Sequence, residues 1–245
     1  MYIKTEGIVL RETKYKDHDK LLTVLTKELG KVTVRVREPR GLRGGRSASC
    51  QLLAYSEFTL LERQGRYTAS EVNLIELFLG LRDDLELFSL ASYFAQVCEV
   101  VVQEEDPSEE VLSLLLNCLF ALSKLQKPQN LVKAVFELRL MSISGFLPDL
   151  RGCLTCGKAD ADRFNITLGA LQCSTCAAGE SIRLPLSPGT LAAMRYLTVC
   201  DAKRLFSFRL SEEGMQELSH IAESYLSVQL ERGFSTLDFY KSLFL

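Results

Sequence analysis

The sequence contains no long run of apolar residues. No segment of the 245 residues approaches the roughly 18 uninterrupted apolar residues of a membrane span, and the first twenty lack an apolar stretch long enough for a signal peptide. We therefore expect a soluble, cytoplasmic protein. Thiols stay reduced in that compartment, so the eight cysteines do not indicate a disulfide scaffold.

Residues that commonly carry catalysis are scarce as well. There are only two histidines, and neither His18, among charged residues, nor His220, on a predicted helix, has a recognisable catalytic partner. A phosphate-binding loop is also missing, because GLRGGR is followed by SASC rather than by Lys-Ser/Thr at the start of a helix. The sequence does not predict an enzyme.

The net charge of −2 is distributed unevenly. Residues 1–80 contain fourteen Lys and Arg against ten Asp and Glu, whereas residues 81–245 contain fifteen against twenty-one. The positive charge is further concentrated in REPRGLRGGR, residues 37–46, which holds four arginines and a single glutamate. A basic end in a chain that is acidic on average indicates a polyanionic partner.

The N-terminal third of the chain shows the pattern of short strands. Five segments are rich in β-branched, aromatic and leucine residues and partly alternate with polar ones: GIVLRE, KLLTVLT, KVTVRVRE, SEFTLLER and RYTASEVN. Five strands at this spacing predict a small closed barrel, for which the oligonucleotide-binding (OB) fold is the natural candidate. An SH3-like barrel fits nearly as well.

After about residue 80 the apolar residues follow the period of helices. The pattern predicts helices over residues 84–103, from about 107 to 125, over 129–144, from Ser187, and from near Ser211. For the second helix, Asp106 is the expected N-cap and Pro107 lies in the expected first turn.

The expected fold class is α+β with more than one domain. An OB barrel over residues 1–80 is followed by a helical domain over residues 81–245, and residues 150–180 form a cysteine-rich module inserted in that domain. No internal repeat or low-complexity linker separates these parts.

The inserted module contains two Cys-x-x-Cys pairs in GCLTCGKADADRFNITLGALQCSTC. The first pair is Cys153 and Cys156, the second pair is Cys173 and Cys176, and sixteen residues lie between Cys156 and Cys173. Each pair can offer two thiolates to one ion from a tight turn, and this spacing lies within the pattern of four-cysteine zinc sites. The intervening RFNITLGALQC predicts a short hairpin around Gly169 that returns the second pair to the first. The four cysteines are therefore the predicted ligands of one Zn²⁺.

Four thiolates leave no open position for water or substrate, so the predicted zinc ion is structural. A thioredoxin-like redox site would need one Cys-x-x-Cys beside a βαβ unit, and a base deaminase would need a His-x-Glu element; the sequence shows neither. Cys98, Cys118 and Cys200 lie in or at the end of apolar helical runs, as is typical of buried thiols. Cys50 lies in a polar stretch and could be exposed or packed.

Basic residues of the predicted barrel form a candidate nucleic-acid site. Arginines in a Gly-rich loop can follow a flexible backbone and pair bidentately with phosphates, and nearby lysines would extend this edge. The candidate DNA-binding residues are Arg35, Arg37, Arg40, Arg43, Arg46, Lys14, Lys16 and Lys20. A solvated basic loop without a specific partner fits the pattern equally well. Four aromatic residues could stack on bases, although at least half of them are expected in the core: Tyr15, Tyr55, Phe58 and Tyr67.

Taken together, the segments resemble the RecO family of bacterial DNA repair and recombination mediators along nearly the full chain. The similar segments are EGIVLRETKYKDHDKLLTVLTKELGKV, GLRDDLELFSLASYF, VFELRLMSISGFLPDL, the two cysteine pairs and LPLSP. One departure follows the third predicted strand, where family members commonly carry a Lys-Gly-Ala-Arg-like segment and this chain reads REPRGLRGG.

The resemblance implies an N-terminal OB domain, a helical domain, a zinc module and a non-enzymatic activity. That activity is to bind single- and double-stranded DNA, to anneal complementary strands, and to act with RecR so that RecA replaces the single-strand-binding protein SSB. It also implies that the helical domain holds the short acidic, hydrophobic-ended tail of SSB, for which Lys133 and Arg139 are candidates.

Two other hypotheses stay open at this point. The chain could be a zinc-containing protein-interaction adaptor without direct DNA activity, in which the zinc module and the acidic helical part recruit partners. A thiol oxidoreductase would instead require reactive thiols and turnover of a disulfide substrate.

Overall fold

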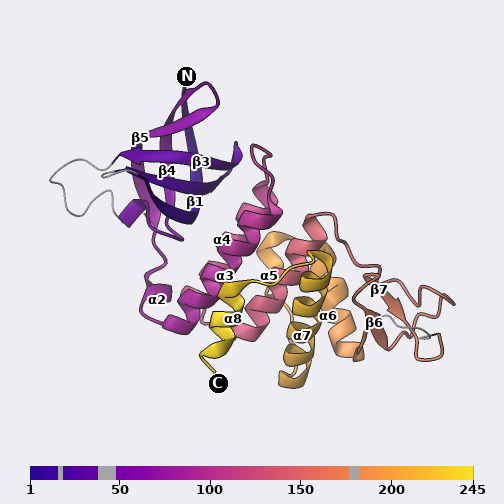
Figure 1. The fold of residues 1–245 in the computed structure, drawn as a ribbon. Helices are drawn as coiled ribbons and strands as arrows, with labels where there is room; N and C mark the ends of the chain where they lie inside the picture. Colours follow the sequence, from indigo (N-terminus) through magenta and orange to yellow (C-terminus); the bar gives the residue numbers. More distant parts are fainter. Residues whose placement is uncertain (16–18, 38–47, 177–181, 245) are drawn as a thin grey trace. The chain divides into compact units, whose positions relative to one another are not determined.

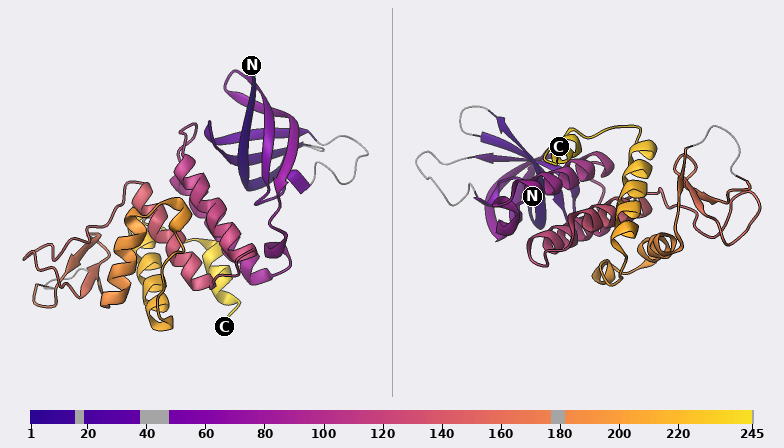
Figure 2. Two further views of the ribbon diagram at one scale, coloured as in Figure 1. Left: turned by 180° about the vertical axis from the view of Figure 1, so that it is seen from behind. Right: turned by 90° about the horizontal axis from the view of Figure 1, so that it is seen from below.

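The computed structural model describes residues 1–15, 19–37, 48–176 and 182–244 (Figures 1 and 2). The chain divides into two compact units, each of which is described by itself. Unit 1 consists of Met1–Leu125 together with Phe234–Leu245, and unit 2 consists of Gln126–Gly233. Within the described ranges, no helix combines the length and apolar character that crossing a membrane requires.

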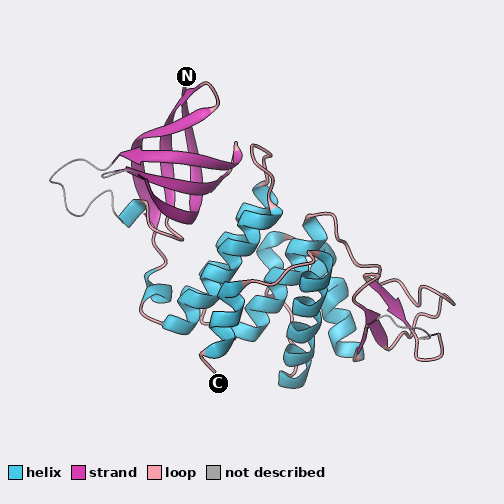
Figure 3. Ribbon diagram, viewed as in Figure 1, coloured by secondary structure: helices cyan, strands magenta, loops and turns pink. Residues whose placement is uncertain are grey.

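Unit 1 begins with a closed barrel, seen as the group of magenta strands near the N-terminus in Figure 3. Its strands are β1 (Tyr2–Tyr15), β2 (Asp19–Thr26), β3 (Gly30–Arg37), β4 (Tyr55–Arg63) and β5 (Arg66–Glu76). They lie in the order β1-β2-β3-β5-β4, with β1 paired to β4 and with β3 parallel to β5. This is the strand order of the OB fold, so the predicted OB barrel is confirmed and the SH3-like alternative is wrong.

Side-chain alternation explains why these residues form a barrel. In β3, Val32, Val34 and Val36 are buried, whereas the polar residues between them are partly or fully exposed. The three valines join Phe58 and Leu60 of β4 in the barrel core. Because successive side chains of a strand point to opposite faces, the arginines of β3 lie on the outer wall.

The helical part of unit 1 comprises α2 (Leu79–Arg82), α3 (Leu85–Val101), α4 (Glu109–Ser123) and α8 (Ser235–Ser242). α3 confirms the first predicted helix. It begins after Asp84, whose side chain accepts hydrogen bonds from the backbone N–H groups of Glu86 and Leu87 (2.9 and 3.1 Å). This N-cap satisfies two backbone donors that would otherwise have no partner within the helix.

The start of α4 differs from the prediction. Asp106 is not its N-cap and Pro107 does not lie in its first turn, because the helix begins two residues after the proline and its N-terminus lacks a side-chain cap. The backbone of Asp106 instead packs against Gly30 at the start of β3. The N–H group of Glu105 also donates to the carbonyl oxygen of Lys31 (3.1 Å). These contacts hold the segment beside the barrel and delay the helix.

Polar contacts join the barrel to α3. The Nζ atom of Lys31 donates to the backbone carbonyl of Glu99 (2.7 Å), and the Nε atom of Arg11 lies 3.1 Å from the Glu99 carboxylate. Glu99 therefore receives one cation from β1 and one from β3.

The C-terminal helix α8 is absent from the sequence-based expectation. It packs on α3, where the Oγ1 atom of Thr236 donates to the side-chain oxygen of Gln96 (2.5 Å). Just before α8, the ring of Phe234 meets that of Tyr93 edge to face, with centroids 5.6 Å apart. The chain thus returns to unit 1 after it has formed unit 2.

Unit 2 contains α5 (Gln129–Ile143), α6 (Pro188–Val199), α7 (Glu212–Gln229) and the short 3₁₀ helix η1 (Ala202–Arg204). The three long helices confirm the remaining predicted ones. Ser187 and Ser211 cap α6 and α7, because their hydroxyls accept from the N–H groups of Thr190 and Gly214. α5 packs against both other long helices and is buried along most of its length.

A small sheet completes unit 2. Its strands are β6 (Arg163–Asn165), β7 (Ala170–Gln172) and β8 (Arg183–Pro185), in the order β7-β6-β8. The antiparallel pairing of β6 with β7 confirms the predicted hairpin, and Gly169 adopts a left-handed conformation at its turn (φ 61°). The side chain of Gln229 on α7 donates to the carbonyl oxygens of Ile166 and Thr167 (2.9 and 3.1 Å). The observed architecture therefore agrees with the predicted fold class.

Candidate metal centre and nucleic-acid interface

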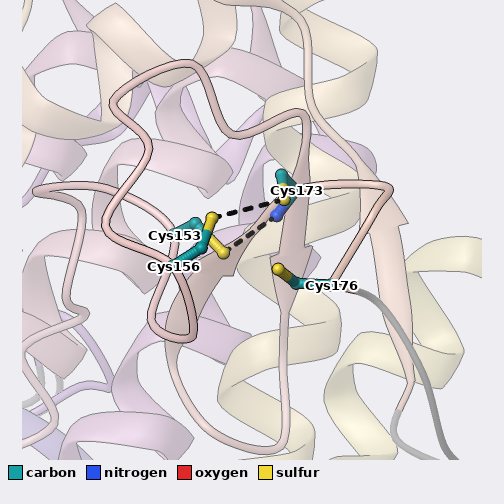
Figure 4. A group of neighbouring side chains, drawn as sticks. All are labelled: Cys153, Cys156, Cys173 and Cys176. Carbon is teal, nitrogen blue, oxygen red and sulfur yellow. Dashed lines mark hydrogen bonds between the residues drawn. The ribbon is translucent and has the colours of Figure 1, made fainter.

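Four cysteines of unit 2 form one cluster (Figure 4). The sulfur atoms of Cys153, Cys156, Cys173 and Cys176 all lie within 4.8 Å of one another. The first pair precedes β6 and the second follows β7, so the hairpin brings together residues from two turns. At these distances a single metal ion could contact all four sulfurs.

Backbone hydrogen bonds shape the two cysteine turns. The N–H group of Gly157 donates to the carbonyl of Cys153 (2.8 Å), and that of Cys176 donates to the carbonyl of Cys173 (3.0 Å). Gly157 adopts a left-handed conformation (φ 73°), which glycine reaches without steric cost. Each turn thereby directs both of its sulfurs toward the other pair, as Figure 4 shows.

The surroundings of the sulfurs favour a bound cation. The backbone N–H groups of Cys156 and Cys173 lower the pKa of Cys153 to about 6, and that of Cys176 lowers the pKa of Cys173. In contrast, hydrogen bonding with the neighbouring sulfurs of Cys173 and Cys156 raises the pKa of Cys176. Deprotonation of a further thiol in the cluster is therefore unfavourable, and a bound cation would make it favourable by offsetting the negative charge. Four thiolates suit a closed tetrahedral site with a structural role.

The cysteines outside the cluster are all buried: Cys50, Cys98, Cys118 and Cys200. Burial raises the pKa of Cys98 and of Cys118, so both remain neutral thiols. Cys50 belongs to the barrel core, which resolves the question that its polar sequence context left open. None of these thiols has the exposed, thiolate character that a thiol oxidoreductase needs.

The described barrel contains half of the predicted DNA-binding residues, namely Lys14, Lys20, Arg35 and Arg37. Lys14, near the end of β1, and Arg37, the last residue of β3, are both exposed. The other four predicted residues lie outside the described residues: Lys16, Arg40, Arg43 and Arg46. His18 and Pro39 lie outside them as well.

Arg35 and Lys20 each contact a carboxylate on a neighbouring strand. The Nε atom of Arg35 donates to Oδ2 of Asp19 (2.7 Å), and its guanidinium carbon lies 5.8 Å from the ring centre of Tyr15. The Nζ atom of Lys20 lies 2.8 Å from Oε1 of Glu12. These two cations are therefore partly neutralised within the barrel, which the count of basic residues does not reveal.

The four aromatic candidates for base stacking differ in exposure, and Tyr67 is half-buried against the barrel core. Phe58 is fully buried in the barrel core. The hydroxyl of Tyr55 donates to Glu6 (2.5 Å), and burial raises the pKa of this tyrosine. Tyr15 lies at the basic end of the barrel beside Arg35, and 38% of its surface is exposed.

The two candidate residues for the SSB tail have structural partners. Lys133 is buried on α5, and its Nζ atom lies 3.0 Å from Glu137 and 2.8 Å from Glu223 of α7. Burial alone would lower the pKa of Lys133, but the two carboxylates outweigh it and raise that pKa. Arg139 donates to the carbonyls of Leu197 and Thr198 at the end of α6 (3.2 and 2.8 Å). Both cations thus connect helices of unit 2.

Unit 2 has a groove that the sequence did not predict. Its volume is about 520 Å³, and its lining residues are Leu147, Pro148, Asp149, Leu150, Arg151, Arg195, Thr198 and Val199. Leu147 and Val199 are 61% and 80% exposed, so the groove offers apolar surface. The Nε atom of Arg195 donates to the carbonyl of Leu150 (2.8 Å) and so joins its two walls. The sequence signal that could have predicted this groove is the presence of apolar residues beside arginines just after α5 and at the end of α6.

Comparison with known proteins agrees with this architecture. The family described as Recombination protein O N terminal matches residues 1–78, and that described as Recombination protein O C terminal matches residues 82–238. The DNA repair protein RecO of Acetivibrio thermocellus is 33% identical over 244 residues, which cover 99% of this chain and 97% of that protein. RecO of Symbiobacterium thermophilum is 32% identical over 244 residues, with 97% and 96% covered. RecO of Bacillus subtilis is 28% identical over 226 residues, with 92% and 88% covered.

The two family matches adjoin each other and together include the barrel, the four-cysteine cluster and the helices around it. The similarity to full-length relatives extends across the same range. The chain therefore belongs to the RecO family, whose members are non-enzymatic proteins of DNA repair and recombination.

Proposed function

We propose that this chain binds single- and double-stranded DNA, anneals complementary strands and, with RecR, helps RecA to replace SSB on single strands. The observation that carries the proposal is an OB barrel with a basic end in a chain that matches RecO along its length. OB barrels bind oligonucleotides on strands 2 and 3 and on adjoining loops. Here β2 and β3 take those strand positions, so we assign DNA binding to residues 1–80, in the bacterial cytoplasm at the nucleoid.

Charge neutralisation supports annealing as the activity. Two complementary strands repel each other through their phosphates, and cations that bind both backbones reduce this repulsion. Lys14 and Arg37 are exposed on the barrel, and Arg40, Arg43 and Arg46 follow directly in the sequence. Guanidinium groups bind phosphates bidentately without changing a covalent bond, which suits a non-enzymatic protein.

For the cysteine cluster we propose one structural Zn²⁺ held by Cys153, Cys156, Cys173 and Cys176. Its ligand set of four thiolates matches the closed tetrahedral sites that zinc prefers. The ion would cross-link the turn before β6 to the turn after β7 and so stabilise a module with a three-stranded sheet of very short strands. No step in DNA binding is assigned to it.

For the SSB tail we propose the groove of unit 2 in place of Lys133, with Arg139, which donates to the carbonyl of the groove residue Thr198, kept as a candidate beside it. A short acidic tail with a hydrophobic end needs an apolar surface next to positive charge. Leu147 and Val199 offer exposed apolar surface, and Arg195 lies on the same groove with its side chain exposed. Lys133 is unsuited to this role, because it is buried between two carboxylates.

Annealing of SSB-coated complementary strands tests the proposed function directly. The unmodified chain should accelerate annealing, and RecR with RecA should then form filaments on the coated single strands. The triple variant R40A/R43A/R46A should bind single-stranded DNA more weakly and with a shallower dependence on salt.

The adaptor hypothesis makes the opposite forecast. An adaptor would capture SSB or RecR without measurable affinity for DNA and without acceleration of annealing.

DNA binding that does not depend on salt, or no effect of the triple substitution on DNA binding, would reject the assignment of the basic residues as the DNA site.

A further inference from the structure

One carboxylate, that of Asp19, lies at the end of the three strands on whose outer face the DNA site is proposed. Tyr15 of β1, Asp19 of β2 and Arg37 of β3 are directly opposite one another across three strands. Arg35 is directly opposite Leu21, which places it diagonal to Asp19 on the same face. Asp19 therefore has Tyr15 and Arg37 opposite it on the two neighbouring strands and Arg35 diagonal to it.

Asp19 and Arg35 form a close ion pair. Both Nε and Nη2 of Arg35 donate to Oδ2 of Asp19, with the Nε contact at 2.7 Å. The side chain of Asp19 is only 12% exposed and that of Arg35 is 34% exposed, so water reaches the pair mainly from the arginine side. The Nε/Nη2 edge is one that guanidinium groups use to bind a phosphate bidentately.

We propose that Asp19 competes with DNA phosphate for Arg35 and thereby weakens the hold of the barrel on DNA. A phosphate that binds the Nε/Nη2 edge of Arg35 must displace the Asp19 carboxylate, which then remains as a negative charge beside the DNA. This inference rests on the proposed DNA-binding function. A DNA affinity that is lowered in this way suits annealing, because the protein must release the duplex that it has helped to form.

The barrel offers a matched control pair. Lys4 of β1 and Glu57 of β4 form a cross-strand ion pair at 2.9 Å, and they too are diagonal, because Lys4 is directly opposite Thr59. Lys4 lies eleven residues before Tyr15 on β1, away from the proposed DNA-binding wall. Glu57→Gln therefore changes the net charge of the protein as Asp19→Asn does, without releasing a cation on that wall.

The test measures binding of a fluorescent single-stranded oligonucleotide over a range of salt concentrations. Asp19→Asn should tighten binding by about threefold to tenfold at low salt, as expected when one competing charge is removed. It should also steepen the slope of log affinity against log salt by about 0.7, the contribution of one added phosphate contact on a single strand. Glu57→Gln should leave both quantities unchanged.

A double-variant cycle identifies Arg35 as the group released. Arg35→Gln alone should weaken binding. In that background, Asp19→Asn should no longer tighten binding by more than about twofold, because the competed guanidinium is gone. A gain of the same size with and without Arg35 would overturn the proposal in favour of a general effect of charge.

Failure of this inference can be told apart from failure of the proposed function. If the unmodified chain binds DNA and Asp19→Asn binds equally well or more weakly, the competition proposal is wrong while the function stands. If neither the unmodified chain nor any variant binds DNA, the proposed function is rejected together with this inference. Thermal unfolding checks that each variant is folded, and Asp19→Ser replaces Asp19→Asn if the asparagine variant is not.

Discussion

Gly30 lies directly against the backbone of Asp106, so closely that a Cβ atom on the glycine would overlap the Asp106 carbonyl group. Gly30 also has a left-handed backbone (φ 67°). This contact fixes the β2–β3 turn to the segment between α3 and α4. It is also the reason why α4 starts later than the pattern of capping residues predicts.

The first prediction concerns this contact. Gly30→Ala should lower the free energy of unfolding of unit 1 by about 2–4 kcal/mol, because the new methyl group adds both backbone strain and overlap. Urea unfolding followed by circular dichroism measures the change.

Gly65→Ala is the matched control. Gly65 has a similar backbone (φ 71°) in the β4–β5 turn, but nothing lies within 4 Å of the position of its Cβ. Its cost should be about 1 kcal/mol, from backbone strain alone. Equal costs for the two substitutions would show that the overlap with Asp106 has no energetic weight.

The second prediction concerns Lys133. Lys133→Met should destabilise unit 2 by about 3–5 kcal/mol, because it leaves the carboxylate of Glu137, which is fully buried, without its cation. Lys203→Met, on the exposed helix η1, should change stability by less than about 0.5 kcal/mol. A small loss from Lys133→Met would mean that Glu137 and Glu223 do not depend on the lysine for stability.

The third prediction is the pH dependence of the same cation. The pKa of Lys133 is raised above its ordinary value of 10.5 in the folded protein. Its contribution to stability is therefore complete below pH 10.5 and is lost as the pH rises through the folded-state pKa. The difference in unfolding free energy between the unmodified chain and Lys133→Met should shrink at alkaline pH. A constant difference would show that the ammonium charge is not the stabilising feature.

The fourth prediction concerns the cysteine cluster. Metal analysis should find about one zinc per chain, and Cys153→Ser should lose it and destabilise unit 2, because folding and metal binding are coupled in such sites. Cys98→Ala, a change at a buried thiol outside the cluster, should keep the zinc. A folded, metal-free protein purified without chelator would contradict the assignment.

The fifth prediction concerns the groove. A fluorescent acidic peptide with a hydrophobic C-terminus should bind the unmodified chain, and Arg195→Glu should weaken binding at least about tenfold through charge repulsion. Arg209→Glu introduces the same charge change outside the groove lining and should have little effect. Equal losses from both changes would point to a non-specific effect of net charge.

Local pattern predicts much of this molecule. The alternation of Val32, Val34 and Val36 is visible within one strand, and the spacing of the cysteine pairs defines a hairpin without knowledge of the rest of the fold. Capping serines likewise mark α6 and α7. These features depend on residues close in sequence, which is why the barrel, the helices and the cluster are recognisable in advance.

Features that depend on residues distant in sequence are the ones that the pattern does not reveal. The role of Asp106 is decided by Gly30, and the availability of Arg35 is decided by Asp19, sixteen residues before it. Lys133 looks like a surface cation until Glu223 of α7 is placed beside it. Charge counts identify the basic end of the barrel, but only tertiary contacts show which of its cations already have a carboxylate partner.

The return of α8 to α3 has a consequence for biosynthesis. The ring of Tyr93 cannot meet Phe234 until residue 234 has left the ribosome, by which time the whole of unit 2 has been made. Unit 2 is continuous in sequence, whereas unit 1 needs residues from both ends of the sequence and must wait with this part of α3 uncovered. Unit 1 is thus the last part of the described chain to be completed, and premature termination before Phe234 would leave it unfinished even though all five strands of the barrel had been synthesised.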